Sequence, residues 1–104
     1  MTDNATMTIS ELANTVITLA SEKKVMLVLA ESCTGGMIAA ALTDIAGSSA
    51  VLDRGLVTYS NQAKQDLLGV SDDILASYGA VSAETAIAMT TGALLKTPAA
   101  QLAA

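Results

Sequence analysis

The run VMLVLA at residues 25–30 is the feature that most limits what this chain can fold into. Six consecutive apolar residues leave no polar face, so the strand they predict must be covered on both sides, as strands in parallel sheets are. The run passes at once into small and polar residues, then into Gly35 and Gly36 and an alanine-rich segment that suits a helix. Strand, tight turn and helix in this order are typical of α/β proteins. We therefore expect an α/β fold in which this strand is parallel to its neighbours.

The remaining patterns fit one small domain over residues 1–104. Thr8 and Glu11 have capping-box spacing before a helix that ends near Glu22. Further helices are expected at 34–45, 61–69, 71–78 and 83–95, and a second strand at 51–60. The expected N-caps of the last three helices are Asn61, Ser71 and Ser82. Residues 99–104 resemble the approach to a strand that the chain does not complete.

Composition and charge exclude several classes of function. The net charge is −5 and aromatic residues make up 2% of the chain, which argues against binding nucleic acid. The absence of histidine, together with a single cysteine, argues against a zinc site, and we expect no metal. No apolar run is long enough for a membrane span, and the acidic Asp3 does not suit a signal peptide. One cysteine excludes an internal disulfide, so a cytoplasmic protein is expected.

The turn at residues 31–36 admits two interpretations. Glycines at the start of a helix let a ligand approach free backbone N–H groups, where the helix dipole favours negative charge. However, the sequence has no G-x-G-x-x-G pattern, and no lysine follows Gly36 as a P-loop requires. From these residues alone, an ordinary tight turn and an anion-binding turn both remain open.

Two serines, Ser32 and Ser49, are candidate nucleophiles at turns that flank the same predicted helix. A Ser-His-Asp triad is impossible without histidine, so the only base left is a lysine amine that burial keeps uncharged. Lys64 follows Tyr59 by five residues, just past a predicted strand, where both side chains can reach the same crevice. Each residue alone has an ordinary structural explanation, but charged residues are scarce in this chain. Cys33 has no histidine to activate it and is expected to be a small buried residue.

Five motifs in a fixed order carry a family resemblance. They are AESCTGG (30–36), IAGSS (45–49), DRGLVTYSNQAK (53–64), LLGV (67–70) and YGAVSAETA (78–86). Together they resemble the C-terminal domain of the competence/damage-inducible protein CinA, a family that includes stand-alone nicotinamide-nucleotide amidohydrolases. The resemblance runs from about residue 8 to the end. It implies a three-layer α/β/α sandwich with a mostly parallel sheet, and hydrolysis of nicotinamide mononucleotide to nicotinic acid mononucleotide and ammonia. It implies a small-molecule nucleotide substrate and no metal, and we expect no other cofactor. The high apolar content and the unfinished sheet favour a homo-oligomer.

Carried over to this sequence, the resemblance implies a site built from Ser32, Ser49, Tyr59 and Lys64. It favours Ser49 as the nucleophile and Lys64 as the general base. Ser32, Thr34 and Tyr59 would then place the substrate or donate hydrogen bonds to the oxyanion. Ser32 remains an alternative nucleophile, because both serines border the same predicted helix.

The resemblance also implies that the turn binds substrate through Thr34, Gly35 and Gly36. The backbone N–H groups of Gly35 and Gly36 would hold either the substrate phosphate or the tetrahedral oxygen, since one set of donors rarely serves both. The paired glycines would thus open one wall of an amidase pocket.

Members of the family continue through a further strand into a Thr-Gly-Ile-Ala-Gly-Pro-Gly-Gly-like loop, and then through more strands to a last helix. A threonine and an arginine associated with substrate binding lie in that part. Since this sequence stops at Ala104, where that strand is due, we expect an incomplete sheet with an open apolar edge. We also expect reduced activity of this chain alone. The alternatives are a catalytically impaired nucleotide-binding remnant and a fragment that oligomerises.

Overall fold

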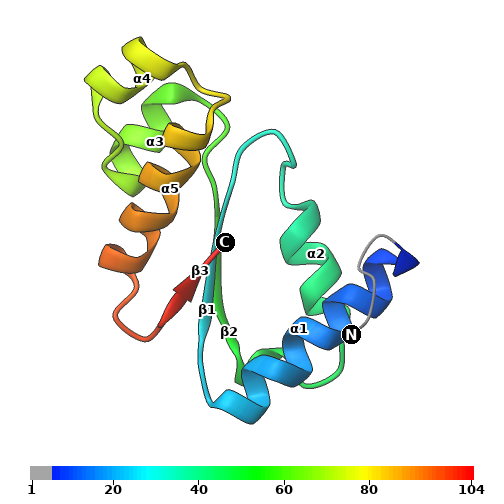
Figure 1. Cartoon of the computed structure of the whole chain (residues 1–104). Helices are drawn as coiled ribbons and strands as arrows, with labels where there is room; N and C mark the ends of the chain where they lie inside the picture. The colour runs from blue at the N-terminus through cyan, green and yellow to red at the C-terminus, as the bar shows by residue number, and fades with distance from the viewer. Residues whose placement is uncertain (1–5) are drawn as a thin grey trace.

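A parallel sheet of three strands forms the centre of the fold in a computed structural model, which describes residues 6–104 (Figure 1). The elements are α1 (Ile9–Lys23), β1 (Leu27–Glu31), α2 (Met37–Thr43), the 3₁₀ helix η2 (Ser48–Ala50), β2 (Leu52–Val57), α3 (Asn61–Leu68), α4 (Asp72–Tyr78), α5 (Ala83–Lys96) and β3 (Leu102–Ala103). Helices α1 and α2 cover one face of the sheet, and α3, α4 and α5 lie on the other. The expected three-layer α/β/α sandwich is confirmed.

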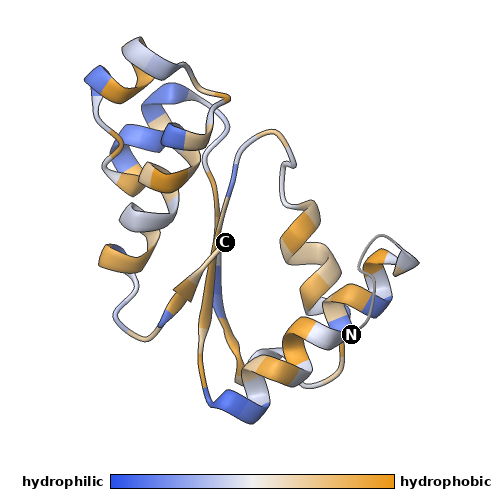
Figure 2. Ribbon diagram, in the orientation of Figure 1, coloured by the Kyte–Doolittle hydropathy of each residue, from blue (hydrophilic) through white to orange (hydrophobic). Residues whose placement is uncertain are grey.

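The central strand is β1, which lies between β2 and β3 and pairs parallel with both. Leu27 and Leu29 pack into the core shared with α1 and α2, whereas Val28 packs into the core beneath α3, α4 and α5. The apolar colouring of β1 in Figure 2 reflects these two cores. The unbroken apolar run is thus explained by burial on both faces, as expected for a middle parallel strand.

Most of the helix starts follow the sequence pattern. The capping box of Thr8 and Glu11 is present, and Ser71 and Ser82 each accept a hydrogen bond from a backbone N–H of the helix that they cap. The expected cap at Asn61 was wrong by one residue. Ser60 is the N-cap of α3 and accepts from the Ala63 N–H at 3.0 Å. Asn61 is the first residue of the helix.

The C-terminal segment does reach the sheet, contrary to the expectation that residues 99–104 stop short of a strand. Strand β3 pairs with the first residues of β1. The Ala30 N–H donates to the Ala104 carbonyl at 2.8 Å, and the Ala104 N–H donates to the Val28 carbonyl at 3.1 Å. A two-residue strand has too short a pattern to be recognised in the sequence.

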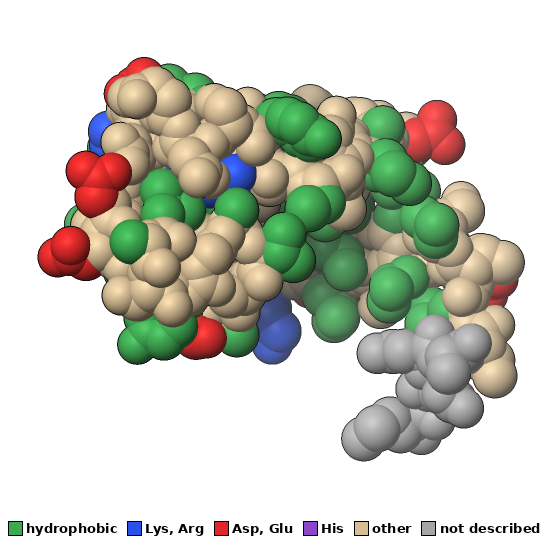
Figure 3. Space-filling model, turned by 90° about the horizontal axis from the view of Figure 1, so that it is seen from above, with side chains coloured by type: hydrophobic (Ala, Val, Ile, Leu, Met, Phe, Trp, Pro, Cys, Tyr) green, Lys and Arg blue, Asp and Glu red, His purple; other side chains and the backbone are tan. Residues whose placement is uncertain are grey.

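An open apolar groove of about 530 Å³ lies between the sheet, α1 and α2, beside β3. Thr34 supplies the polar side chain of its lining; Ile9, Met37 and Leu102 are the most exposed of the large apolar ones. Figure 3 shows hydrophobic side chains around this hollow. Within residues 6–104, no helix combines the length and the apolar character needed to cross a bilayer.

Helices α3 and α5 approach each other closely at Gly92. A Cβ atom at this position would overlap the carbonyl oxygen of Leu68 in the last turn of α3. Leu68 lies four residues after Lys64, and both side chains are on the buried face of α3. The lack of a side chain at Gly92 therefore lets α3, the helix that carries Lys64, pack closely against α5.

We predict that Gly92→Ala lowers the free energy of unfolding by about 1–3 kcal/mol, because the added methyl group must push α3 away from α5. Urea unfolding followed by circular dichroism measures this. The control is Thr91→Ala on the exposed side of the same helix, which is expected to change stability much less. Equal effects of the two substitutions would contradict the close packing at Gly92.

Candidate active site

Two adjacent residues, Glu31 and Ser32, emerge at the carboxyl end of β1 and point to opposite faces of the sheet. Successive side chains of a strand alternate between faces. Glu31 shares the α1–α2 face with Leu27 and Leu29, and its carboxylate meets the start of α2. Ser32 lies on the other face, where its hydroxyl meets the side chain of Lys64 from α3. One turn thus contacts both helical layers.

Lys64 contacts Ser32 through its side-chain amine. Its Nζ lies 2.9 Å from the Ser32 Oγ, 2.9 Å from the Thr58 carbonyl oxygen and 3.1 Å from the Tyr59 carbonyl oxygen. The side chain is fully buried, although it comes from a short surface helix. A lysine is rarely buried unless its amine has hydrogen-bond partners, and here it has three oxygen atoms.

Tyr59 contributes to the site through its backbone. Its carbonyl oxygen accepts from Lys64, whereas its side chain is 76% exposed. The expected role of the Tyr59 ring in placing substrate stays a prediction, because contacts within the chain do not test it. Cys33, expected to be buried, is exposed, because it lies in the turn after the strand has ended.

No hydrogen bond joins Ser49 to Lys64 within residues 6–104, where the Lys64 amine contacts Ser32 instead, and the expected role of Ser49 as nucleophile stays a prediction. Ser49 lies in η2, ahead of the first residue of β2, and Lys64 follows the last residue of β2. The six residues of β2 lie between them, and at about 3.3 Å per residue they separate the two by roughly 20 Å. The two serines border the same helix, as expected, but α2 and its flanking turns carry them to opposite ends of the sheet.

Glu31 is the residue that the sequence analysis missed. It is 2% exposed, and its carboxylate accepts four hydrogen bonds. They come from the Thr34 hydroxyl at 2.7 Å and from the backbone N–H groups of Gly36 at 3.2 Å, Ile38 at 3.0 Å and Ala39 at 3.0 Å. A glutamate at the end of an apolar strand, in a chain with few charges, was the available signal for a buried carboxylate.

These bonds give the donors of the turn acceptors within the chain, and the expected binding of a substrate anion there stays a prediction. The Gly36 N–H and the Thr34 hydroxyl already donate to Glu31, and the Gly35 N–H donates to the Ser32 carbonyl at 3.0 Å. The anion at the N-terminus of α2 is thus the protein's own carboxylate. Both glycines have positive φ, 60° and 108°, which explains why the turn needs them.

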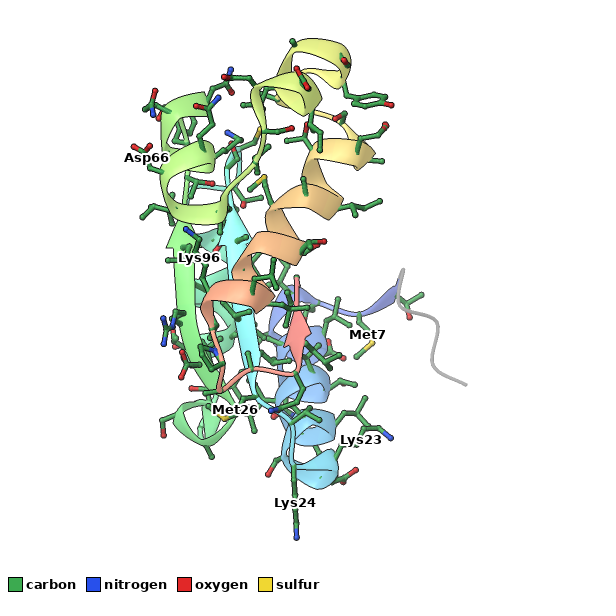
Figure 4. All side chains as sticks on the ribbon, turned by 90° about the vertical axis from the view of Figure 1, so that its left-hand side faces the viewer. Met7, Lys23, Lys24, Met26, Asp66 and Lys96 are labelled. Atoms are coloured by element: carbon green, nitrogen blue, oxygen red, sulfur yellow. The ribbon has the colours of Figure 1, made fainter. Side chains whose placement is uncertain are left out.

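The other cations of the sequence lie away from this site. Lys23 and Lys24 extend from the end of α1 toward solvent, and Lys96 lies beside the end of α3 (Figure 4). Arg54 pairs with Asp53. Within residues 6–104, histidine, cysteine, aspartate and glutamate side chains form no group of three or more that could hold a metal ion.

Comparison with known proteins assigns the family. The model of the CinA C-terminal domain matches residues 9–103. The chain belongs to the CinA C-terminal domain family. The nicotinamide-nucleotide amidohydrolase PncC of Escherichia coli is 46% identical over 94 residues. A CinA-like protein of Syntrophus aciditrophicus is 56% identical over 81 residues. A crystal structure of a CinA superfamily protein from Escherichia coli is similar, with a TM-score of 0.87 and 34% identity.

These relatives are longer than this CinA domain. The match covers 90% of the chain and 55% of the Escherichia coli amidohydrolase, and 78% of the chain and 19% of the Syntrophus protein. It covers 95% of the chain and 57% of the solved structure. The chain therefore spans about half the length of the amidohydrolase it resembles. The resemblance drawn from the five motifs is confirmed at the level of the family.

The pKa of Glu31 reflects two opposing effects. Burial raises it by disfavouring the charged form, and the hydrogen bonds from Thr34, Ala39, Ile38 and Gly36 together lower it more, so that it lies below its ordinary value of 4.5. A carboxyl with a lower pKa in the folded state stabilises the fold at pH values above its pKa in the unfolded chain. That stabilisation is lost as the pH falls through the folded-state value.

We predict that Glu31→Gln lowers the free energy of unfolding of this CinA domain by about 1–3 kcal/mol at neutral pH, because backbone donors lose a carboxylate. The difference from the native chain should hold above about pH 5 and shrink as the pH falls further. Chemical unfolding at a series of pH values measures it. Glu22→Gln, at an exposed glutamate of α1, is the control. A difference that stays constant down to low pH would contradict the role of the carboxylate.

Proposed function

We propose that this CinA domain carries the catalytic pair of an amidohydrolase that converts nicotinamide mononucleotide to nicotinic acid mononucleotide and ammonia. Ser32 is the nucleophile in this proposal and Lys64 is the general base. The observation that carries it is the 2.9 Å contact between the Lys64 Nζ and the Ser32 Oγ. The printed name of the Escherichia coli relative supports the choice of a nicotinamide nucleotide as substrate.

In this proposal the Lys64 amine acts as the base in its uncharged form. An uncharged amine has two N–H donors and one lone pair. The carbonyl oxygens of Thr58 and Tyr59 can take both N–H groups, at 2.9 and 3.1 Å. The lone pair is then free to accept the Ser32 hydroxyl proton. Two fixed backbone carbonyls therefore orient Lys64 toward Ser32 without help from a histidine or a carboxylate.

The proposed reaction has two halves. The Ser32 oxygen forms a bond with the carboxamide carbon while its proton passes to the Lys64 amine. The tetrahedral intermediate collapses, the C–N bond breaks, and Lys64 returns the proton to the leaving nitrogen, which departs as ammonia. Water then attacks the acyl ester with Lys64 again as base, and the Ser32 hydroxyl is restored when its C–O bond breaks.

The other candidate site residues have less structural support than this pair. Ser49 is remote from Lys64 in the chain, and the turn at Gly35 and Gly36 has its donors occupied by Glu31 and the Ser32 carbonyl. The contacts therefore favour Ser32 over Ser49 as the nucleophile. They also weigh against a role as a binding remnant that holds a phosphate at this turn.

The setting of the reaction is part of the same proposal. We place it in the cytoplasm, within the salvage of pyridine nucleotides, because the chain has one free cysteine and resembles a nucleotide amidohydrolase. A net charge of −5 does not suit a nucleic-acid partner. Self-association with a second copy is also proposed, because apolar side chains are exposed along the groove beside β3.

We predict that ammonia release from nicotinamide mononucleotide falls at least about 10²-fold in Ser32→Ala and in Lys64→Met, since each removes one member of the pair. Methionine keeps most of the buried alkyl chain of Lys64, so the fold should survive. A coupled assay for ammonia, with circular dichroism of each variant, measures the effect.

The matched comparison is Ser49→Ala, which is expected to retain most of the activity. Loss of activity in Ser49→Ala with retention in Ser32→Ala would reverse the assignment of the nucleophile. If the native chain releases no more ammonia than Lys64→Met, the proposed function of this chain fails.

A further inference from the structure

We propose that Glu31 is a positioning residue for the nucleophile, a role that rests on the function proposed above. Glu31 touches neither Ser32 Oγ nor Lys64 through its own side chain. It acts by fixing the turn that carries Ser32, so that the hydroxyl stays within hydrogen-bonding distance of the Lys64 amine.

The Glu31 carboxylate holds the end of the turn that leads into α2. One oxygen, Oε1, accepts from the Thr34 hydroxyl and the N–H groups of Gly36 and Ile38, while Oε2 accepts from the Ala39 N–H. The turn between β1 and α2 is therefore held to the residue that immediately precedes Ser32. Charge assists these bonds, because the start of a helix presents positive partial charge to the carboxylate.

The backbone of Glu31 links the same residue to the base. Its carbonyl oxygen accepts from the Thr58 N–H at 2.8 Å, which continues the pairing of β1 with β2. The Thr58 carbonyl in turn accepts from the Lys64 Nζ at 2.9 Å. Glu31 thus sets the position of Ser32 relative to α2 with its side chain and relative to Lys64 with its main chain.

The proposal distinguishes positioning from a general contribution to stability. An amide in place of the carboxylate keeps the size of the side chain but has one oxygen acceptor instead of two, and its N–H₂ group faces backbone donors. The turn should then loosen while β1 and α2 remain. Misplacing a reacting group by about 1 Å can cost roughly 10²-fold in rate, so a small movement of Ser32 is measurable.

The test compares Glu31→Gln with Glu11→Gln, which removes a carboxylate from the capping box of α1, on the face of the sheet away from Lys64. In steady-state kinetics with nicotinamide mononucleotide, Glu31→Gln should lower kcat about tenfold or more and change KM less than about twofold. Glu11→Gln should change neither. In NMR spectra without substrate, the Nζ and Cε shifts of Lys64 should move in Glu31→Gln and stay in place in Glu11→Gln.

Unchanged kcat and unchanged Lys64 shifts in a folded Glu31→Gln would overturn the positioning role, as would equal kinetic losses in the two variants. If the native chain shows no activity, the proposed function fails, and the Lys64 shifts alone decide whether Glu31 positions Ser32. If Glu31→Gln does not fold, Thr34→Val takes its place. It removes one of the four bonds, so a smaller shift at Lys64 supports the proposal and none contradicts it.

Discussion

The hydrogen bond between the Lys64 amine and the Ser32 hydroxyl joins two parts of the chain that are 32 residues apart, and much of the fold bears on it. Burying an amine away from water is unfavourable unless its hydrogen bonds are replaced. The replacements here are the hydroxyl and two backbone carbonyls at the carboxyl end of β2. The parallel pairing of β1 with β2 brings the hydroxyl and the carbonyls together, and α3, the helix that carries Lys64, packs closely against α5 at Gly92.

The turn between β1 and α2 has a second constraint, which acts through Glu31. A helix that begins at a tight turn leaves backbone N–H groups without partners, and in many proteins a bound anion or a side chain satisfies them. In this chain the buried carboxylate does so. Because successive side chains of β1 alternate between the faces of the sheet, Glu31 faces α2 while Ser32 faces α3. The turn is hydrogen-bonded to Glu31 on one face of the sheet and presents the Ser32 hydroxyl on the other.

Most of the fold could be predicted from the sequence, because its signals are local. The unbroken apolar run over 25–30 indicated a strand buried on both faces, and Thr8, Ser71 and Ser82 marked helix starts that the structure confirms. The two-residue strand β3 was missed, since its pairing with β1 depends on distant residues rather than on its own pattern.

The site was harder to predict because its geometry depends on the topology. Ser32 and Ser49 flank the same helix in the sequence, yet that helix and its flanking turns carry them to opposite ends of the sheet. Lys64 and Leu68 have the spacing of a buried helix face, which was a usable signal for the burial of the lysine. The sequence carries only a weak signal for the contact between Glu31 and the start of α2, namely a lone acidic residue at the end of an apolar strand.

Labelling with a serine-directed electrophile tests the central claim most directly. The chain would be treated with a fluorophosphonate, digested and analysed by mass spectrometry to find the modified residue, with Lys64→Met treated in parallel. If Lys64 is the base that activates Ser32, we expect modification at Ser32 in the native chain and little modification in Lys64→Met. Modification at Ser49 instead, or equal labelling of Ser32 with and without the lysine, would contradict the account.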